Sequence, residues 1–154
     1  MDTQAFNNLL TDIPSILNGD WISKNSAYET ELCQEIGWNL NTNRYFDAEK
    51  NNICIEIKKG KSIWLDLVRY SEIVLNIGEQ NTITAFFIPN QRRTQIEKIY
   101  FVETSKIINH LKIDTNIAQR LISLNQGVPR SLNCQASLTV RDISSLAFYT
   151  KIFS

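Results

Sequence analysis

The sequence predicts an α/β domain in which a central β-sheet of four to five strands is flanked by helices. Two nearly continuous apolar runs, 82–89 (TITAFFIP) and 96–102 (IEKIYFV), are typical of strands buried on both faces. A third run, 53–58, alternates isoleucine with Cys, Glu and Lys, the period-2 pattern of a strand. The length of 154 residues and the hydrophobic content of 43% suit one compact domain, which we place over residues 1–154.

Two helices are expected before the first strand. The first carries its apolar residues on one face: Phe6, Leu9, Leu10 and Ile13. Pro14 interrupts this helix, whose apolar face either covers the core or meets a partner. The segment 26–29 reads as a capping box that opens a second helix through Ile36, and Gly37 ends it. Glu29 falls inside the apolar stripe of the second helix, either as a residue of a site or only as the partner of its cap.

A β-hairpin is expected next. Residues 44–48 can run antiparallel to the 53–58 strand, because a polar, Asn-rich segment between them supplies a turn. A turn centred on residues 50 and 51 pairs Asp47 with Cys54. Directly opposed residues lie on the same face of an antiparallel pair, so this register decides which side chains meet.

The hairpin gathers two carboxylates and an ammonium group on one face. Asp47 lies diagonally from Glu56, and Lys58 shares their face, although a one-residue bulge would turn Asp47 away. Two carboxylates at that separation repel each other unless a cation lies between them, and hard oxygen ligands suit Mg²⁺ or Mn²⁺. The backbone carbonyl of Ile57 is a further candidate ligand. Lys58 can hold a metal-bound water or stabilise a developing oxyanion, which predicts phosphodiester hydrolysis.

Asp47, eight intervening residues and then Glu56-Ile57-Lys58 resemble the core motif of the PD-(D/E)XK nucleases, which have the restriction endonuclease-like fold. The resemblance implies a helix, a three-stranded meander, a helix and a further strand in a mixed sheet. It implies that Asp47 and Glu56 ligate the metal, that Lys58 attends the attacking water, and that an inward Glu29 adds an acidic residue. Phe46 stands where the family's nominal Pro would be.

The segments after the hairpin supply the remaining elements of that order. Apolar residues recur at helical spacing after Ser62, a possible N-cap, and Gly78 would stop this helix; they are Ile63, Leu67, Tyr70, Val74 and Ile77. After the two buried strands, Thr104 or Ser105 opens a short helix through Leu111. The resemblance therefore spans about residues 26–112.

The C-terminal part is expected to add a helix, a strand and another helix. The first helix covers 116–125, with Asp114 or Thr115 as its cap, and a turn follows at 127–129. A strand over 132–138 precedes a capping box at 139–142. That box opens a final helix, which carries apolar residues at Leu146, Phe148 and Tyr149.

Basic residues cluster beside the hairpin, although 16 basic and 16 acidic residues cancel over the whole chain. The candidate DNA contacts are Arg44, Lys59, Lys61, Arg92 and Arg93. Ordinary solvation of a loop explains the two lysines equally well. The arginine pair suits either base edges or simply a polar turn between strands.

Other features predict a cytoplasmic protein with reduced thiols. Three cysteines lack CxxC spacing, so neither disulfides nor a zinc site are expected. No apolar run reaches the length of a membrane span, and residues 1–4 lack the basic start of a signal peptide.

These observations together favour a Mg²⁺-dependent endonuclease that cuts double-stranded DNA, most like a small type II restriction endonuclease acting as a homodimer. Mn²⁺ is expected to substitute for Mg²⁺. The alternatives are a Holliday-junction or other structure-specific nuclease, a catalytically silent DNA-binding or assembly domain of the same fold, and an unrelated α/β protein in which the hairpin is coincidental.

Overall fold

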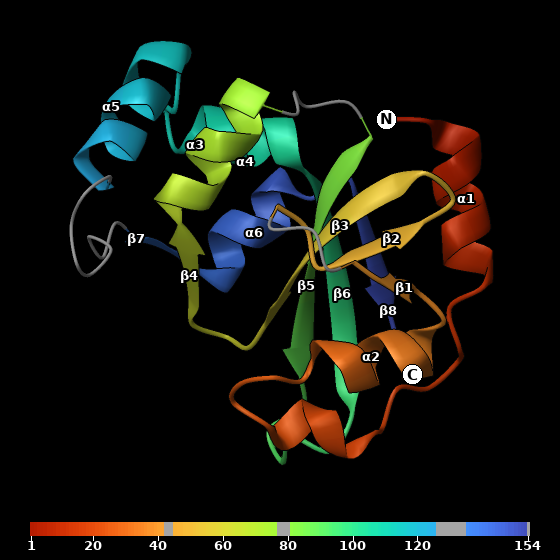
Figure 1. Cartoon of the computed structure of the whole chain (residues 1–154). Helices are drawn as coiled ribbons and strands as arrows, with labels where there is room; N and C mark the ends of the chain where they lie inside the picture. The colour runs from red at the N-terminus through yellow and green to blue at the C-terminus, as the bar shows by residue number, and fades with distance from the viewer. Residues whose placement is uncertain (42–44, 77–80, 126–134, 154) are drawn as a thin grey trace.

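The chain forms a six-stranded mixed sheet with helices on both faces, as seen in a computed structural model (Figure 1). The structure describes residues 1–41, 45–76, 81–125 and 135–153. The strands lie in the order β1-β2-β3-β5-β6-β8; their bounds are Asn39–Leu40, Ala48–Lys50, Ile53–Lys59, Thr82–Pro89, Ile96–Glu103 and Tyr149–Ile152. Only β3 and β5 pair in parallel among these neighbours. The α/β prediction is confirmed, whereas the expected strand number of four to five is too low.

Within the described ranges, six α-helices and one 3-10 helix surround the sheet. The α-helices are α1 (Thr3–Thr11), α2 (Glu29–Ile36), α3 (Leu67–Asn76), α4 (Thr104–His110), α5 (Thr115–Asn125) and α6 (Val140–Leu146), and the 3-10 helix is η1 (Asp20–Ser23). A crossover from one parallel strand to the next requires a long connection, and α3 lies in the connection between β3 and β5. No helix in the described ranges is long and apolar enough to cross a membrane.

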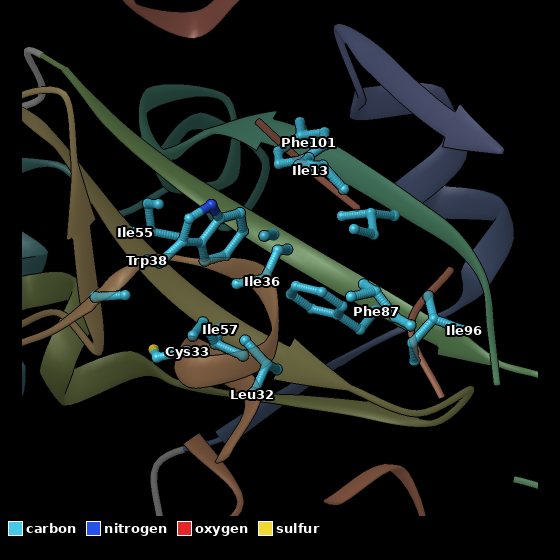
Figure 2. Close-up of a cluster of buried hydrophobic side chains, with 14 of the residues drawn as sticks. Ile13, Leu32, Cys33, Ile36, Trp38, Ile55, Ile57, Phe87, Ile96 and Phe101 are labelled. Atoms are coloured by element: carbon cyan, nitrogen blue, oxygen red, sulfur yellow. The ribbon is translucent and has the colours of Figure 1, made fainter. Parts of the chain in front are cut away.

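The sheet is buried on both faces because successive residues of its central strands enter different cores. One core contains α1, η1 and α2 packed on Ile55, Ile57 and Phe87 (Figure 2). The other contains residues of α3, α4, α5 and α6 with Phe86 and Val102 of the sheet. The apolar face of α1 therefore covers the first core, which resolves the question of whether it is free for a partner.

A carboxylate fastens the N-terminal loop onto α2. Glu35 accepts hydrogen bonds from the backbone N–H groups of Asn18 (3.2 Å) and Gly19 (3.0 Å) and from the indole N–H of Trp21 (2.7 Å). Trp21 is 1% exposed and stacks with Tyr28, which immediately precedes α2. The segment before α2 is thus fixed against the face of the sheet that carries the isoleucines of β3.

Two expected helix starts are wrong. The segment 26–29 makes no capping box, because Ala27 has a φ of +55° and the N-cap residue Tyr28 makes no side-chain cap bond. Helix α2 nevertheless ends at Gly37, whose φ of +82° suits glycine, as expected. The second error concerns the helix expected after Ser62, since residues 63–66 form strand β4.

Strand β4 (Ile63–Asp66) pairs antiparallel with β7 (Gln135–Leu138) in a separate two-stranded sheet. Buried Ile63 and Leu65 alternate with exposed residues, a strand pattern that the helical spacing concealed. Helix α3 starts only at Leu67, and the Oδ1 of Asp66 accepts hydrogen bonds from the backbone N–H groups of Val68 and Arg69. The stop expected at Gly78 lies outside the described residues.

The C-terminal elements follow the expectations except at the end. Asp114 caps α5 by accepting from the N–H of Ile117 (2.8 Å), and the capping box at 139–142 opens α6. Helix α6 ends at Leu146, however, and Tyr149 lies in edge strand β8 rather than in the helix. The expected turn at 127–129 lies outside the described residues.

Candidate active site

The β2–β3 hairpin turns at Asn51 and Asn52, whose φ angles are +53° and +64°. Positive φ at both central residues is the requirement of a two-residue type I′ turn. The register pairs Glu49 with Cys54 and Ala48 with Ile55. The predicted pairing of Asp47 with Cys54 is therefore wrong by two residues. An even shift keeps the paired side chains of β2 and β3 on their expected faces.

Asp47 and Glu56 meet in the structure. The paired register ends at Ala48 and Ile55, and the N–H of Asp47, just before β2, donates to the carbonyl of Ile55 (3.1 Å). The Oδ2 of Asp47 accepts a hydrogen bond from the N–H of Ile57 (2.8 Å). Glu56 is only 2% exposed although it carries a carboxyl group. A buried carboxyl beside a second one requires a proton or a cation.

A cation that the sequence analysis did not assign lies against both carboxyls. The Nη1 of Arg69, in the first turn of α3, is 3.1 Å and 3.0 Å from the two carboxyl oxygens of Glu56 and 3.8 Å from the Oδ1 of Asp47. Lys58 is more distant, with its Nζ 3.9 Å from the Oε1 of Glu56. The site therefore has two carboxyls and two cationic side chains.

The sequence pointed only indirectly to Arg69 as a residue of the site. The predicted carboxylate pair required a cation, which we assigned to a metal ion without considering a side chain from the following helix. The contact depends on the start of α3 at Leu67, where Asp66 caps the helix and directs Arg69 towards β3. Spacing along the chain cannot reveal such a contact.

The electrostatics of the pair favour a proton on Glu56 in the absence of a metal ion. Burial raises the pKa of Glu56 to about 8, and the charge of Asp47 and a hydrogen bond to it add to this effect. Arg69 and Lys58 act in the opposite direction. Glu56 therefore favours its protonated form near neutral pH, as a buried carboxyl does when repulsion by a neighbouring carboxyl is not fully compensated.

The donor set suits one hard divalent ion. Asp47 and Glu56 offer carboxyl oxygens, and the carbonyl of Ile57 points to the Asp47 side because the N–H of the same strand residue does. Mg²⁺ is commonly bound by one or two carboxylates with water in its other positions. Binding here requires loss of the proton on Glu56 and rearrangement of the Arg69 contact.

Glu29 does not complete a three-carboxylate cluster. No group of three His, Cys, Asp or Glu side chains within the described ranges could hold a metal ion. Glu29 is half-buried at the start of α2, and burial together with the charges of Glu29, Asp47 and Glu56 raises the pKa of Tyr28. It therefore belongs to the surroundings of the carboxyl pair, without the cap role that was its alternative interpretation.

The predicted DNA contacts divide into anchored and exposed side chains. The Nζ of Lys59 donates to the carbonyls of Ile22 (2.9 Å) and Lys24 (2.7 Å), so this side chain also fixes the loop before α2. Lys61, Arg92 and Arg93 are exposed. Arg44 lies outside the described residues.

The two cysteines within the described ranges, Cys33 and Cys54, are free thiols, as expected, and Cys134 lies outside them. Comparison of the chain with protein-family models, with curated proteins and with solved structures finds no match.

Proposed function

We propose that this protein is a Mg²⁺-dependent DNA endonuclease, most like a type II restriction endonuclease that acts as a homodimer on double-stranded DNA. The observation that carries the proposal is the meeting of Asp47 with the buried Glu56, with Lys58 beside Glu56 on β3. A buried carboxyl with a raised pKa beside a second carboxyl is more often part of a functional site than of a solvated strand face.

The order of elements also supports the proposal. Apart from strand β4, which lies between β3 and α3, the chain runs through a helix (α2), the antiparallel meander β1-β2-β3, a helix (α3) and the parallel strand β5. This is the order that the resemblance to PD-(D/E)XK nucleases implies. The motif residues lie where β2 and β3 meet, and α3 brings its first turn against them.

The chain's own groups have distinct roles in the proposed reaction. Asp47, Glu56 and the Ile57 carbonyl hold the ion, with the carboxyls in their charged forms. The bound ion supplies a water of lowered pKa and screens charge on the scissile phosphate. Lys58 positions the attacking water or donates to the oxyanion that develops. Arg69 leaves the carboxyls and turns its guanidinium to the phosphate. The planar guanidinium can donate two parallel hydrogen bonds to phosphate oxygens.

The test is incubation of the purified protein with plasmid and bacteriophage DNA in Mg²⁺, in Mn²⁺ and in EDTA. Discrete fragments in either metal, lost in EDTA and in Asp47→Asn, support a restriction endonuclease. Cleavage restricted to four-way junctions favours a structure-specific nuclease instead. The homodimer is tested separately by the mass in solution from light scattering.

One observation favours a second candidate, a catalytically silent DNA-binding domain of the same fold. Arg69 and Lys58 place two cationic side chains within 4 Å of the carboxyls of Asp47 and Glu56, where a metal ion would otherwise supply positive charge. If calorimetry detects no Mg²⁺ or Mn²⁺ binding that depends on Asp47 while DNA binding persists, the silent domain replaces the nuclease.

A further inference from the structure

A basic pocket lies at the end of β3, the strand that carries Glu56 and Lys58. It has a volume of about 410 Å³ and is open to solvent on one side. Its cationic lining residues are Lys59, Lys61 and Arg93, and Asn25 and Gln91 add side-chain amides. No acidic residue belongs to the described lining. In Figure 1 the turn between β5 and β6 reaches the loop before α2 at this end of the sheet.

Neutral groups hold two of these cations in place. Lys59 is fastened by the two carbonyls before α2 and lies over the ring of Tyr28, 4.5 Å from its centroid. An Nη2 hydrogen bond of 2.9 Å joins Arg93 to the Oδ1 of Asn25 across the pocket. Carbonyl and amide oxygens fix position without cancelling charge, so the pocket keeps a positive potential.

The neighbouring charges support that conclusion. Burial and the charge of Arg93 lower the pKa of Lys59, while Glu29 opposes them more weakly. The nearby Lys24 is paired with Glu31 and adds no free charge. Two ordered cations that repel each other are stabilised by an anion bound between them.

We propose that this pocket binds a phosphate group of the nucleic-acid backbone, close to the strand position that carries the proposed active site. Arg93 and Lys61 contact the phosphate oxygens, and the anchored Lys59 supplies charge from the pocket wall. Glu56 and Lys59 are three residues apart on β3, which is about 10 Å along the strand. This inference rests on the proposed function for its choice of a DNA strand.

Binding without cleavage tests the pocket independently of catalysis. Fluorescence anisotropy with a labelled double-stranded oligonucleotide in EDTA is measured for Lys61→Gln, Arg93→Gln and the double variant over a range of salt concentrations. Each single variant should weaken binding about tenfold, the loss of one charge-assisted contact. The double variant should lower the salt slope by about 2. Lys106→Gln, an exposed lysine on α4 at the opposite end of the sheet, is the matched control and should bind as the natural chain does (Figure 1).

The outcomes separate the two proposals. Unchanged affinity and salt slope in the double variant overturn the pocket, even if the natural chain cleaves DNA. A weakened double variant of a chain that never cleaves supports the pocket and contradicts the nuclease. Titration with inorganic phosphate, followed by NMR, identifies the source of the anion. Phosphate binding lost in the double variant, with unchanged oligonucleotide binding, overturns the assignment to a nucleic-acid backbone.

Discussion

Replacement of Glu56 by glutamine should change how the stability of the metal-free protein depends on pH. Glu56 has an ordinary pKa of 4.5 and a pKa of about 8 in the folded chain. A carboxyl whose pKa rises on folding contributes its full stability below the unfolded value and loses it as the pH rises through the folded value. The natural chain should therefore lose stability between about pH 4.5 and pH 8, and Glu56→Gln should not show this loss.

The gap between the two pKa values sets the size of the effect. At 1.36 kcal/mol per pH unit it corresponds to about 5 kcal/mol at pH values above 8 and about 3 kcal/mol at pH 7. These are upper values for the change in the free energy of unfolding that Glu56 causes. The introduced glutamine also weakens the contact with Arg69, but that offset is the same at every pH because glutamine does not titrate.

Urea denaturation in EDTA, followed by circular dichroism from pH 4.5 to 9, measures the free energy of unfolding for both chains. Glu49→Gln is the matched control, since Glu49 is an exposed carboxylate on the same hairpin. The difference between the natural chain and Glu56→Gln should grow with pH, while the control follows the natural chain. A constant difference over this range would refute the assignment of a proton to Glu56.

Three further predictions concern single side chains. Arg69→Met should lower the free energy of unfolding at pH 7 by about 1–3 kcal/mol in urea denaturation, because it leaves two carboxyls without their nearest cation; a more stable variant would contradict this role. Lys58→Ala should lower DNA cleavage at least about 100-fold with oligonucleotide binding unchanged, and unaltered turnover removes Lys58 from the mechanism. Gly19→Ala should destabilise by about 1–3 kcal/mol in thermal unfolding, because its Cβ would lie 2.6 Å from Cδ1 of Trp21; an unchanged midpoint contradicts this packing.

The sequence predicted the elements whose pattern is decided locally. The apolar runs of β5 and β6 and the caps of α5 and α6 needed no knowledge of distant neighbours. Strand β4 was missed because Ile63 fits both a strand and a helix. Its spacing of two to Leu65 is that of a strand, and its spacing of four to Leu67 is that of a helix. Its partner β7 comes from a distant part of the chain, and that pairing selects the strand.

The site, like the fold, was predicted as far as local sequence patterns decide it. Glu56 and Lys58 share a face because side chains alternate along a strand, and the Asp47 carboxyl reaches them through its contacts with the N–H of Ile57 and with Arg69, as the prediction of a common site required. The signal for the correct turn was present, since Asn51 and Asn52 are residues that tolerate positive φ. The depth of Glu56 and the approach of Arg69 depend on how α3 packs on the sheet, which the residues of the hairpin do not encode.

In the proposed nuclease, charge balance at this site would link metal binding to DNA binding. With Arg69 in place, the two carboxyls already have a cationic neighbour, and a divalent ion entering alone would leave an excess of positive charge. A scissile phosphate brings a negative charge and offers the displaced guanidinium a new partner. Each ligand therefore removes an electrostatic obstacle to the other, and the gain in affinity must be equal in both directions. A nuclease of this design holds its ion weakly until DNA arrives, which confines the charged, reactive state of the carboxyl pair to the complex with its substrate.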